Sequence, residues 1–171
     1  PQSSRKALMD EIRKQGEVED VTTCYELPAF SGSGDIVYRP GSEDAVAHFR
    51  DLYGTNANFV SLLEMKVIEG QAFDESYSDS MQLVMVSRQM ATELANAFQW
   101  KDGVVGKKLD IGGHGTDDPF TVVGVYDDVR MGRIDQEGMV NSAIFFSKRA
   151  EQTLVVKFRE RNAENLAHIN N

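Results

Sequence analysis

Residues 120–128, with the sequence FTVVGVYDD, give the clearest indication of fold in this chain of 171 residues. The β-branched and aromatic residues at 120–126 favour a strand, because such side chains pack well on a pleated surface. Gly124 interrupts this run, and a glycine inside a strand indicates a bulge or the close approach of another backbone segment. Asp127 and Asp128 follow as a polar turn, so we expect residues 120–126 to be one strand of a larger sheet.

Elements predicted on both sides of this strand set the fold class. A hairpin through the glycine-rich turn at 112–115 would join it to a strand at 107–111. Ser87 is expected to cap a helix with an apolar stripe at spacings of three and four. Residues 45–53 fit a strand and a helix equally well. Because strands outnumber helices and do not alternate strictly with them, the sequence predicts an α+β fold. The other expected strands are 18–27, 36–39, 65–68, 83–86, 143–146 and 153–158, and the other expected helices are 5–15, a short one near 59–63 capped by Asn56 or Asn58, and one from Ala163.

The composition limits the class of partner. With 41% hydrophobic residues, the chain is long enough for one core or for two small lobes. Its formal charge of -9 argues against nucleic acid as a partner, because no basic segment is concentrated enough to offset repulsion from phosphates.

No window of the sequence approaches the ~20 apolar residues of a membrane-spanning helix. The chain begins at Pro1, and we expect both ends to have been parts of a longer protein.

No residue pattern predicts a catalytic or a cofactor-binding site. Cys24 is the only cysteine, and its place in an expected strand favours a buried thiol over a nucleophile. His48 and His168 each stand alone. The Ser-Gly-Ser-Gly stretch at 31–34 lacks the Lys-Ser/Thr pair of a phosphate loop, so we interpret it as a flexible connection. The aspartates at 127–128 are adjacent, and adjacent strand residues point to opposite faces, which leaves them poorly placed for acid–base catalysis.

Acidic residues offer two places where a metal ion could bind. His114 with Asp117 and Asp118 could hold a weakly bound cation, although the same residues also make an ordinary polar hairpin tip, which we favour. The acidic segment 74–80 resembles a calcium loop only in charge, because Asp79 stands where the sixth position requires glycine. We therefore predict no metal site.

Four motifs occur in the order and spacing of a known family. The first, at residues 58–73, is an aromatic residue, a short helix and a strand, followed by a Gly-x-x-Phe ending. The others are an apolar strand before a capped helix at 83–87, a Val-Gly-Lys element at 105–109, and the Val-Val-Gly-Val strand with its aspartates at 120–128. Together they resemble the MacB-like periplasmic core domain of MacB/FtsX-type ABC transporter permeases, over roughly residues 45–160. The chain departs from the family pattern at Gln71, where Arg is usual, at Val104, where Pro is common, and at 138–143, where a frequent Pro is missing.

The resemblance implies a periplasmic, or more generally extracytoplasmic, domain between the first and second transmembrane helices of a bacterial inner-membrane permease. Such a domain would not be an enzyme and would transmit ATP-driven motion to a substrate or an envelope partner, with no cofactor of its own. Its partners would be a second permease copy, a cytoplasmic ATPase, and a periplasmic protein or lipoprotein. It would meet the membrane only through flanking helices absent from this chain. The alternatives are an FtsX-like regulator of a cell-wall hydrolase and a soluble small-ligand-binding domain.

The resemblance also implies two lobes, with a mixed sheet that carries helices on one face and an inserted β-rich lobe. We expect residues 1–73 and 127–171 to form the membrane-proximal lobe, and about 74–126 to form the distal lobe. Both chain ends should then lie at one pole, where apolar residues of their helices face a common sheet formed by the strands at 18–27 and 153–158. These apolar residues are Leu8 and Ile12 near one end, and Leu166 and Ile169 near the other.

Overall fold

The fold is described from a computed structural model that covers most of the chain. It describes residues 2–25, 27, 34–39, 41–112, 119–130, 141–149 and 152–160. Three regions that the sequence singled out lie wholly or largely outside the described residues. They are the Ser-Gly-Ser-Gly stretch up to Ser33, the polar loop with His114, Asp117 and Asp118, and the helix expected from Ala163, which includes Leu166, His168 and Ile169.

The described residues form nine strands, three α-helices and one short 3-10 helix. The prediction of an α+β fold is therefore confirmed. The strand expected at 18–27 ends at Cys24, and the ambiguous segment 45–53 belongs to a strand that extends to Thr55. In chain order the elements are α1 (Gln2–Arg13), β1 (Val18–Cys24), β2 (Gly34–Tyr38), β3 (Ala45–Thr55), α2 (Phe59–Leu62), β4 (Val67–Gly70), η1 (Asp79–Met81), β5 (Leu83–Ser87), α3 (Arg88–Phe98), β6 (Lys108–Ile111), β7 (Phe120–Tyr126), β8 (Ser142–Phe146) and β9 (Thr153–Phe158).

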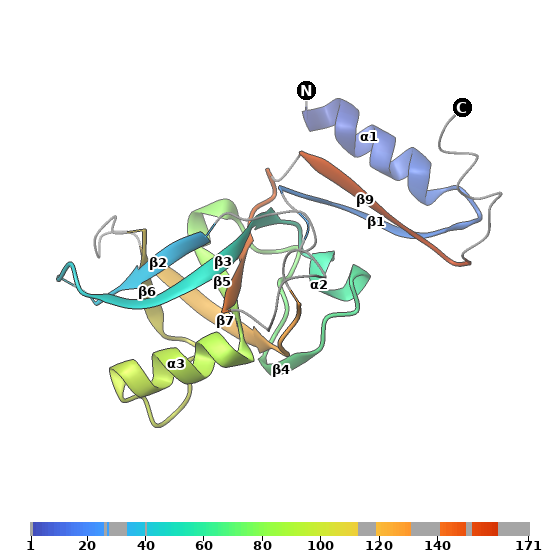
Figure 1. The fold of residues 1–171 in the computed structure, drawn as a ribbon. Coiled ribbons are helices and arrows are strands. Elements are labelled where there is room, and N and C mark those ends of the chain that lie inside the picture. The colour runs from blue at the N-terminus through green and yellow to red at the C-terminus, as the bar shows by residue number, and fades with distance from the viewer. Residues whose placement is uncertain are drawn as a thin grey trace.

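Six strands close into a barrel, which is the larger part of the molecule (Figure 1). They are hydrogen-bonded in the order β2-β6-β7-β5-β8-β3, and β3 pairs back to β2. The pairs β3–β8 and β5–β7 are parallel and the other pairs are antiparallel, so the sheet is mixed. β4 pairs with the second half of β7, beyond the part that pairs with β6. We use the name barrel for β2 to β8 together with α2 and α3.

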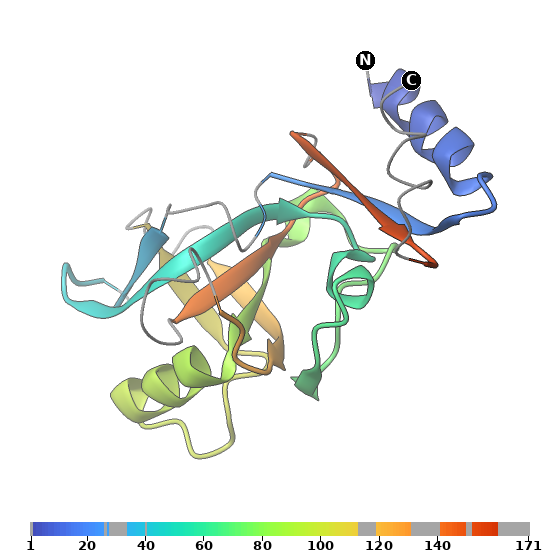
Figure 2. The same cartoon turned by 45° about the vertical axis from the view of Figure 1, so that its right-hand side comes forward.

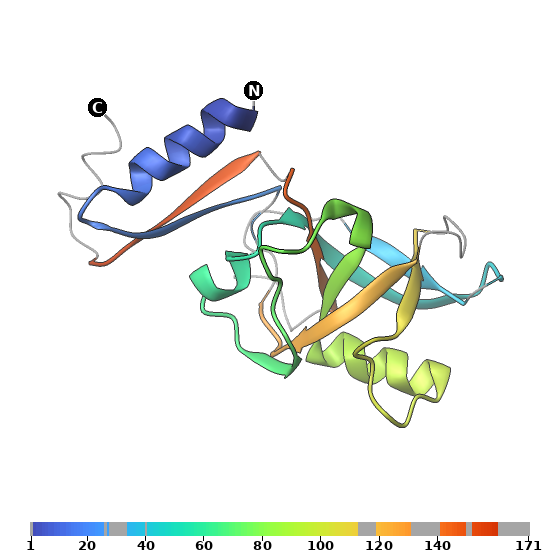
Figure 3. The same cartoon turned by 180° about the vertical axis from the view of Figure 1, so that it is seen from behind.

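The remaining described elements, α1, β1 and β9, form an arm that projects from the barrel (Figures 1 and 3). β1 and β9 pair as an antiparallel ribbon from Val18 opposite Phe158 to Cys24 opposite Thr153. α1 lies along this ribbon, as the rotated view also shows (Figure 2). The ribbon joins the barrel sheet where Cys24 pairs with Thr55 at the end of β3. The first described helix and the last described strand therefore both belong to the arm.

Two apolar clusters stabilise these parts. The first holds α3 against the barrel and includes the buried side chains of Val84, Val86, Met90, Leu94 and Val122. The second connects the barrel with the arm and α2, and includes the buried side chains of Cys24, Phe59, Met85, Tyr126 and Ile144. Neighbours along β5 divide between the two clusters, because successive strand side chains point to opposite faces. β5 is therefore covered on both faces, which explains its continuous apolar sequence.

Strand pairing runs across the boundaries expected between the two lobes. β5 and β7 lie within residues 74–126, yet β5 pairs with β8 and β7 pairs with β4, both of which lie outside that range. The hydrogen bonding of the sheet thus shows no division at 73/74 or at 126/127, and the visible division is between arm and barrel. The three-segment division of the chain stays a prediction.

The expected inner face of α1 needs one correction. Leu8 is 52% exposed, whereas Ile12 is half-buried as expected. Arg5 and Met9 are also half-buried, and with Ile12 they form a stripe at spacings of four and three. Leu8 lies beside this stripe, outside the partly covered face of the helix.

Gly124 lies where two neighbouring strands approach β7. β4 pairs with it through Gly70, and β5 shifts register between Val84 and Met85. A Cβ atom on Gly124 would collide with the carbonyl oxygen of Gln71 and would stand 3.1 Å from Met85 Cε. The close backbone approach and the bulge predicted from the sequence are both confirmed.

We expect Gly124→Ala to lower the free energy of unfolding by about 2 kcal/mol or more, because backbone atoms in a paired sheet cannot yield to an added methyl group. Gly16→Ala is the matched control, since nothing lies within 4 Å of a Cβ atom at that position. Urea unfolding, followed by the fluorescence of the single tryptophan, Trp100, measures both variants. Equal unfolding midpoints for the two variants would contradict the close approach.

Candidate functional site

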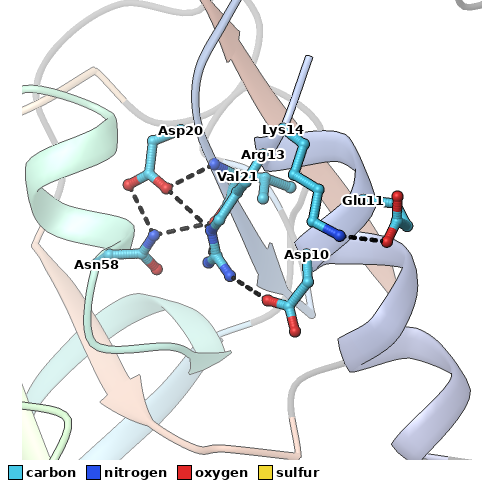
Figure 4. Close-up of polar contacts among 7 residues, drawn as sticks. All are labelled: Asp10, Glu11, Arg13, Lys14, Asp20, Val21 and Asn58. Carbon is cyan, nitrogen blue, oxygen red and sulfur yellow. Dashed lines mark hydrogen bonds and ion pairs between the residues drawn. The ribbon is translucent and has the colours of Figure 1, made fainter.

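The arm and the barrel meet along the edge of β1 that faces away from β9. Here the carbonyl oxygen of Val21 accepts hydrogen bonds from Arg13 Nη2 at 2.9 Å and from Asn58 Nδ2 at 3.0 Å. Asp20 accepts from the same two side chains, at 2.9 Å from Asn58 Nδ2 and 3.5 Å from Arg13 Nε. Figure 4 shows these groups converging from α1, β1 and the turn before α2. We call Arg13, Asp20 and Asn58 the latch.

Local sequence explains how the latch residues are held. Arg13 lies in the last turn of α1, where a positive charge interacts favourably with the helix dipole. Asp10, one turn earlier, holds Arg13 Nη1 at 3.3 Å. Asn58 directly precedes α2, and its side chain makes no capping bond to that helix. A backbone carbonyl at a covered strand edge needs donors in place of water, and the latch supplies two to Val21.

A short polar seam continues from the latch toward the barrel. The Asn56 side chain donates to the Thr23 hydroxyl, and the Asn56 backbone N–H donates to the Thr23 carbonyl at 3.4 Å. One residue beyond β1, the Tyr25 N–H donates to the Gly54 carbonyl at 2.9 Å. The end of β1 is therefore joined to the end of β3 by backbone and side-chain hydrogen bonds together.

Lys157 on β9 makes a second polar connection between arm and barrel. Its Nζ lies 2.7 Å from Glu64 Oε1, just after α2, and 3.0 Å from Glu19 Oε1 on β1. The hydrogen bond to Glu64, followed by that to Glu19, raises the pKa of Lys157, and the same bond to Lys157 lowers the pKa of Glu64. Because Glu64 is well exposed, solvent screens this pair and it contributes little to stability.

An open groove of about 550 Å³ lies beside the latch, between α1 and the barrel. This volume is within the range of small-molecule sites, about 300–1,000 Å³. Four of the five charged residues in its walls are basic, in a chain whose formal charge is -9. The apolar walls are Met9, Ala57 and Phe146, the neutral polar ones are Thr23, Asn56 and Asn58, and the charged ones are Arg5, Lys6, Arg13, Glu75 and Lys148.

Cys24 lies in the apolar cluster between arm and barrel. Its side chain is fully buried, and burial raises the pKa of the thiol to about 11. At neutral pH the thiol is therefore protonated, and a protonated, inaccessible thiol is a poor nucleophile. The structure supports the interpretation of Cys24 as a packing residue.

The aspartates after β7 serve the start of α3. Asp127 Oδ1 lies 2.8 Å from Arg88 Nη2, and Asp128 Oδ1 accepts from the Gln89 backbone N–H at 2.8 Å. Ser87 caps the same helix by accepting from the Met90 N–H at 3.3 Å, as the sequence predicts. Carboxylates at a helix N-terminus complement its unpaired N–H groups and its dipole. The two aspartates thus bind separate groups of one helix turn.

The acidic segment 74–80 is organised by its own backbone and by the residues after β8. Asp74 Oδ1 accepts from the Ser76 N–H at 2.8 Å, and hydrogen bonds from Ser76 lower the pKa of Asp74. Asp79 Oδ1 accepts from the Lys148 N–H at 2.7 Å. Across the ranges that the structure describes, no three His, Cys, Asp or Glu side chains are grouped so that they could hold a metal ion. His48 lies exposed on β3, apart from these carboxylates.

No sequence pattern marks the latch or the groove. Asn58 precedes a helix, so the sequence predicts a capping role for it or for Asn56, and this prediction is wrong for Asn58. Both asparagine side chains instead bond to β1, more than 30 positions earlier in the chain. Arg13 follows a helical charge pattern that by itself indicates only a solvated face. A signal for these contacts would have required knowledge of the tertiary pairing.

A comparison with protein families identifies one match. The model of the MacB-like periplasmic core domain matches residues 3–167, which is nearly the whole chain. No curated protein matches the chain by sequence.

Solved structures show the same fold at low sequence identity. The periplasmic region of MacB from Actinobacillus actinomycetemcomitans has a TM-score of 0.54 and 16% identity, covering 96% of this chain and 69% of that one. The extracellular domain of the noncanonic ABC-type transporter YknZ from Gram-positive bacteria has a TM-score of 0.60 and 15% identity, covering 94% and 74%. A domain described as part of a permease protein from Porphyromonas gingivalis has a TM-score of 0.56 and 16% identity, covering 95% and 72%.

We expect Arg13→Met to loosen the arm without unfolding the barrel, because it removes the donors to Val21 and Asp20 but keeps an apolar side chain of similar length. One lost hydrogen bond of about 1 kcal/mol corresponds to roughly fivefold faster amide exchange. Hydrogen exchange should therefore accelerate in β1 and β9 and stay unchanged in β5 and β7. Lys14→Met is the control, since Lys14, just after α1, forms its ion pair with Glu11 of the same helix and takes no part in the latch. Equal effects of both variants would show that the latch does not hold the arm.

We expect the Cys24 thiol to resist alkylation by iodoacetamide at about pH 8, and to react rapidly when the chain is unfolded in guanidinium. The folded pKa is raised, so the stability that the protonated thiol contributes is present below the ordinary thiol pKa and is lost as the pH rises toward about 11. Mass spectrometry of the alkylated chain follows the reaction at each pH. Rapid labelling of the folded chain near neutral pH would contradict the buried position.

Proposed function

Because this chain belongs to the family of MacB-like periplasmic core domains, we propose that it transmits the ATP-driven conformational change of an ABC transporter permease to a substrate or an envelope partner. As a member of this family, it is the extracytoplasmic domain of a MacB-like permease. None of the helices in the described part of the chain has the length and apolar character needed to cross a membrane. The ATPase and the transmembrane helices of the proposal lie on other parts of the transporter.

The observation that carries this proposal is the way the arm is joined to the barrel. The arm contains the first and the last described elements, so a motion delivered by flanking transmembrane helices would enter through it. A two-stranded ribbon is only marginally stable in water by itself. Here α1 covers the ribbon, and the latch fixes the angle between the ribbon and α2. In this proposal the arm therefore moves as one rigid unit.

A continuous backbone path leads from the arm into the barrel. β1 pairs with β9 along its length and with β3 at its end, where Cys24 lies opposite Thr55. β3 in turn pairs with β2 and β8 inside the barrel. A displacement of the ribbon is therefore passed to the barrel through sheet hydrogen bonds, and rigid-body motion of this kind is a common way to transmit conformational change.

The proposal assigns different partners to the two parts. The arm would be moved by a permease dimer, in which a second permease copy carries the same domain and a cytoplasmic ATPase supplies the energy. The barrel would contact the cargo, a periplasmic protein or a lipoprotein. An FtsX-like regulator of a cell-wall hydrolase would use the same motion and would differ only in the partner that the barrel contacts.

The test uses the full-length permease with its ATPase in lipid nanodiscs. A nitroxide label at Lys101→Cys on the barrel reports the distance between the two copies, and Cys24 can stay because it is buried. We expect the distance distribution to shift by several Å between the nucleotide-free and the ATP-trapped states. In the Arg13→Met background ATP hydrolysis should continue, while the shift becomes smaller or broader because the latch no longer fixes the arm.

The Lys14→Met background is the control and should preserve the full shift. A barrel label that keeps the same distance distribution with and without ATP would refute transmission by this domain. The same shift on addition of ATP to a permease paired with an ATPase variant that cannot bind ATP would also refute it, because the motion would then be independent of nucleotide binding.

A further inference from the structure

We propose that the groove between α1 and the barrel binds a small amphipathic anion, a molecule with one phosphate or carboxylate group and a short apolar part. This inference goes beyond the transmission of motion and does not depend on it. The groove holds about 550 Å³, which suits a small molecule and is too small for a folded partner.

The charge of the groove favours an anion. Arg5, Lys6, Arg13 and Lys148 line it, against one carboxylate, Glu75. The chain as a whole carries 27 acidic and 18 basic residues, so the sign of the charge is reversed here relative to the molecule. A basic concavity in an acidic protein concentrates anions locally and gives them few competing sites elsewhere on the surface.

Two lysines can offer positive charge to a ligand. The Lys148 ammonium lies 2.7 Å from the carbonyl oxygen of Glu75, which does not cancel its positive charge, and it shares part of that charge with Asp74, whose pKa it helps to lower. Lys6 is exposed at the groove wall. The charge of Arg13 is shared with Asp10 and Asp20, so Arg13 mainly shapes the wall. Glu75 offsets part of the total, which favours a compact anionic group over an extended polyanion.

The apolar wall of the groove is rigid on the barrel side. Phe146 is buried on most of its surface and is held by Phe73 and Tyr77, whose ring centroids lie 5.4 and 6.0 Å from its own. Ala57 and Met9 extend this wall on the turn before α2 and on α1. A short alkyl chain or a single ring would cover these side chains, while Lys6 and Lys148 hold the anionic end.

The position of the groove gives binding a structural consequence. The arm supplies the α1 wall and Thr23 of β1, and the other walls belong to the barrel and to the turn that carries Asn58. A ligand in contact with both walls binds the docked arrangement better than a loosened one, so it stabilises the junction by mass action. Occupancy would therefore stiffen the arm at the same contact that the latch fixes.

The experiment titrates the isotope-labelled chain by NMR with matched six-carbon probes. Hexyl phosphate represents a soluble anion, and dihexanoyl phosphatidylglycerol, kept below its micelle concentration, represents a lipid headgroup. Hexanol, hexyltrimethylammonium and inorganic phosphate each lack one required feature. We expect saturable shifts at the amides of Asn56, Ala57 and Asn58 with one or both anionic amphiphiles, at least about tenfold tighter than with any of the three controls.

Paired variants test the role of the lysines. Lys6→Gln with Lys148→Gln should weaken binding about tenfold or more, while Lys14→Gln with Lys101→Gln removes the same net charge outside the groove and should leave binding within about twofold. All four lysines are exposed, so the spectra of the variants should otherwise match that of the unaltered chain. If only hexyl phosphate binds, the natural ligand is a soluble anion. If only the phospholipid binds, the natural ligand is a membrane lipid.

Three outcomes would overturn the proposal. Shifts confined to residues outside the groove would place the site elsewhere. Equal binding of hexanol or of hexyltrimethylammonium would show that the anionic group is not recognised. Equal weakening in both double variants would show a diffuse charge effect. None of these outcomes bears on the nitroxide distances of the full-length transporter, so the two proposals can fail separately.

Discussion

The structure depends on the backbone hydrogen bonding of β3, an 11-residue strand that is paired along both edges. Its pairing with β2 closes the barrel, its parallel pairing with β8 completes the wall, and its last residue, Thr55, meets β1. Thr55 is fully buried, and its carbonyl accepts from the Ser147 N–H at 3.0 Å while its hydroxyl lies 3.4 Å from the Phe145 carbonyl. Barrel closure and arm attachment therefore share one strand, and a slip in its register would disturb both.

Apolar and polar contacts have different roles where the arm meets the barrel. The cluster around Cys24 and Phe59 removes apolar surface from water, a force that has little directional preference. The latch and the Thr23–Asn56 seam have strict geometry, because each hydrogen bond fixes a donor direction. The first kind of contact keeps the arm attached, and the second sets its angle. A domain that transmits motion, as we propose for this one, needs both.

Sequence reasoning reached those features whose causes are local. The glycine in the β7 strand indicated a close approach, and Ser87 before an apolar stripe indicated a capped helix, because both signals lie within a few residues of the feature. Periodicity alone could not tell whether residues 45–53 form a strand or a helix. In the structure they pair with β2 and β8 and therefore form a strand. The exposure of Leu8 on α1 and the turning of Asn58 toward β1 depend on distant partners, so no local pattern contains them. The groove is of the same kind, since its walls come together only in the tertiary structure.

The pairing of β1 with β9 joins the first and the last strands that the structure describes, so the arm is completed only when both strands are available. Pairing between segments so far apart in sequence closes a very long loop, and such contacts form late and slowly. For a chain that crosses a membrane from its N-terminal side, β1 emerges early and waits for its neighbour until almost the whole domain has been translocated. During that interval its edge is unpaired and open to wrong partners. The barrel strands β5 to β8 can meanwhile pair among themselves, so assembly of the arm is the step at which export and correct folding compete.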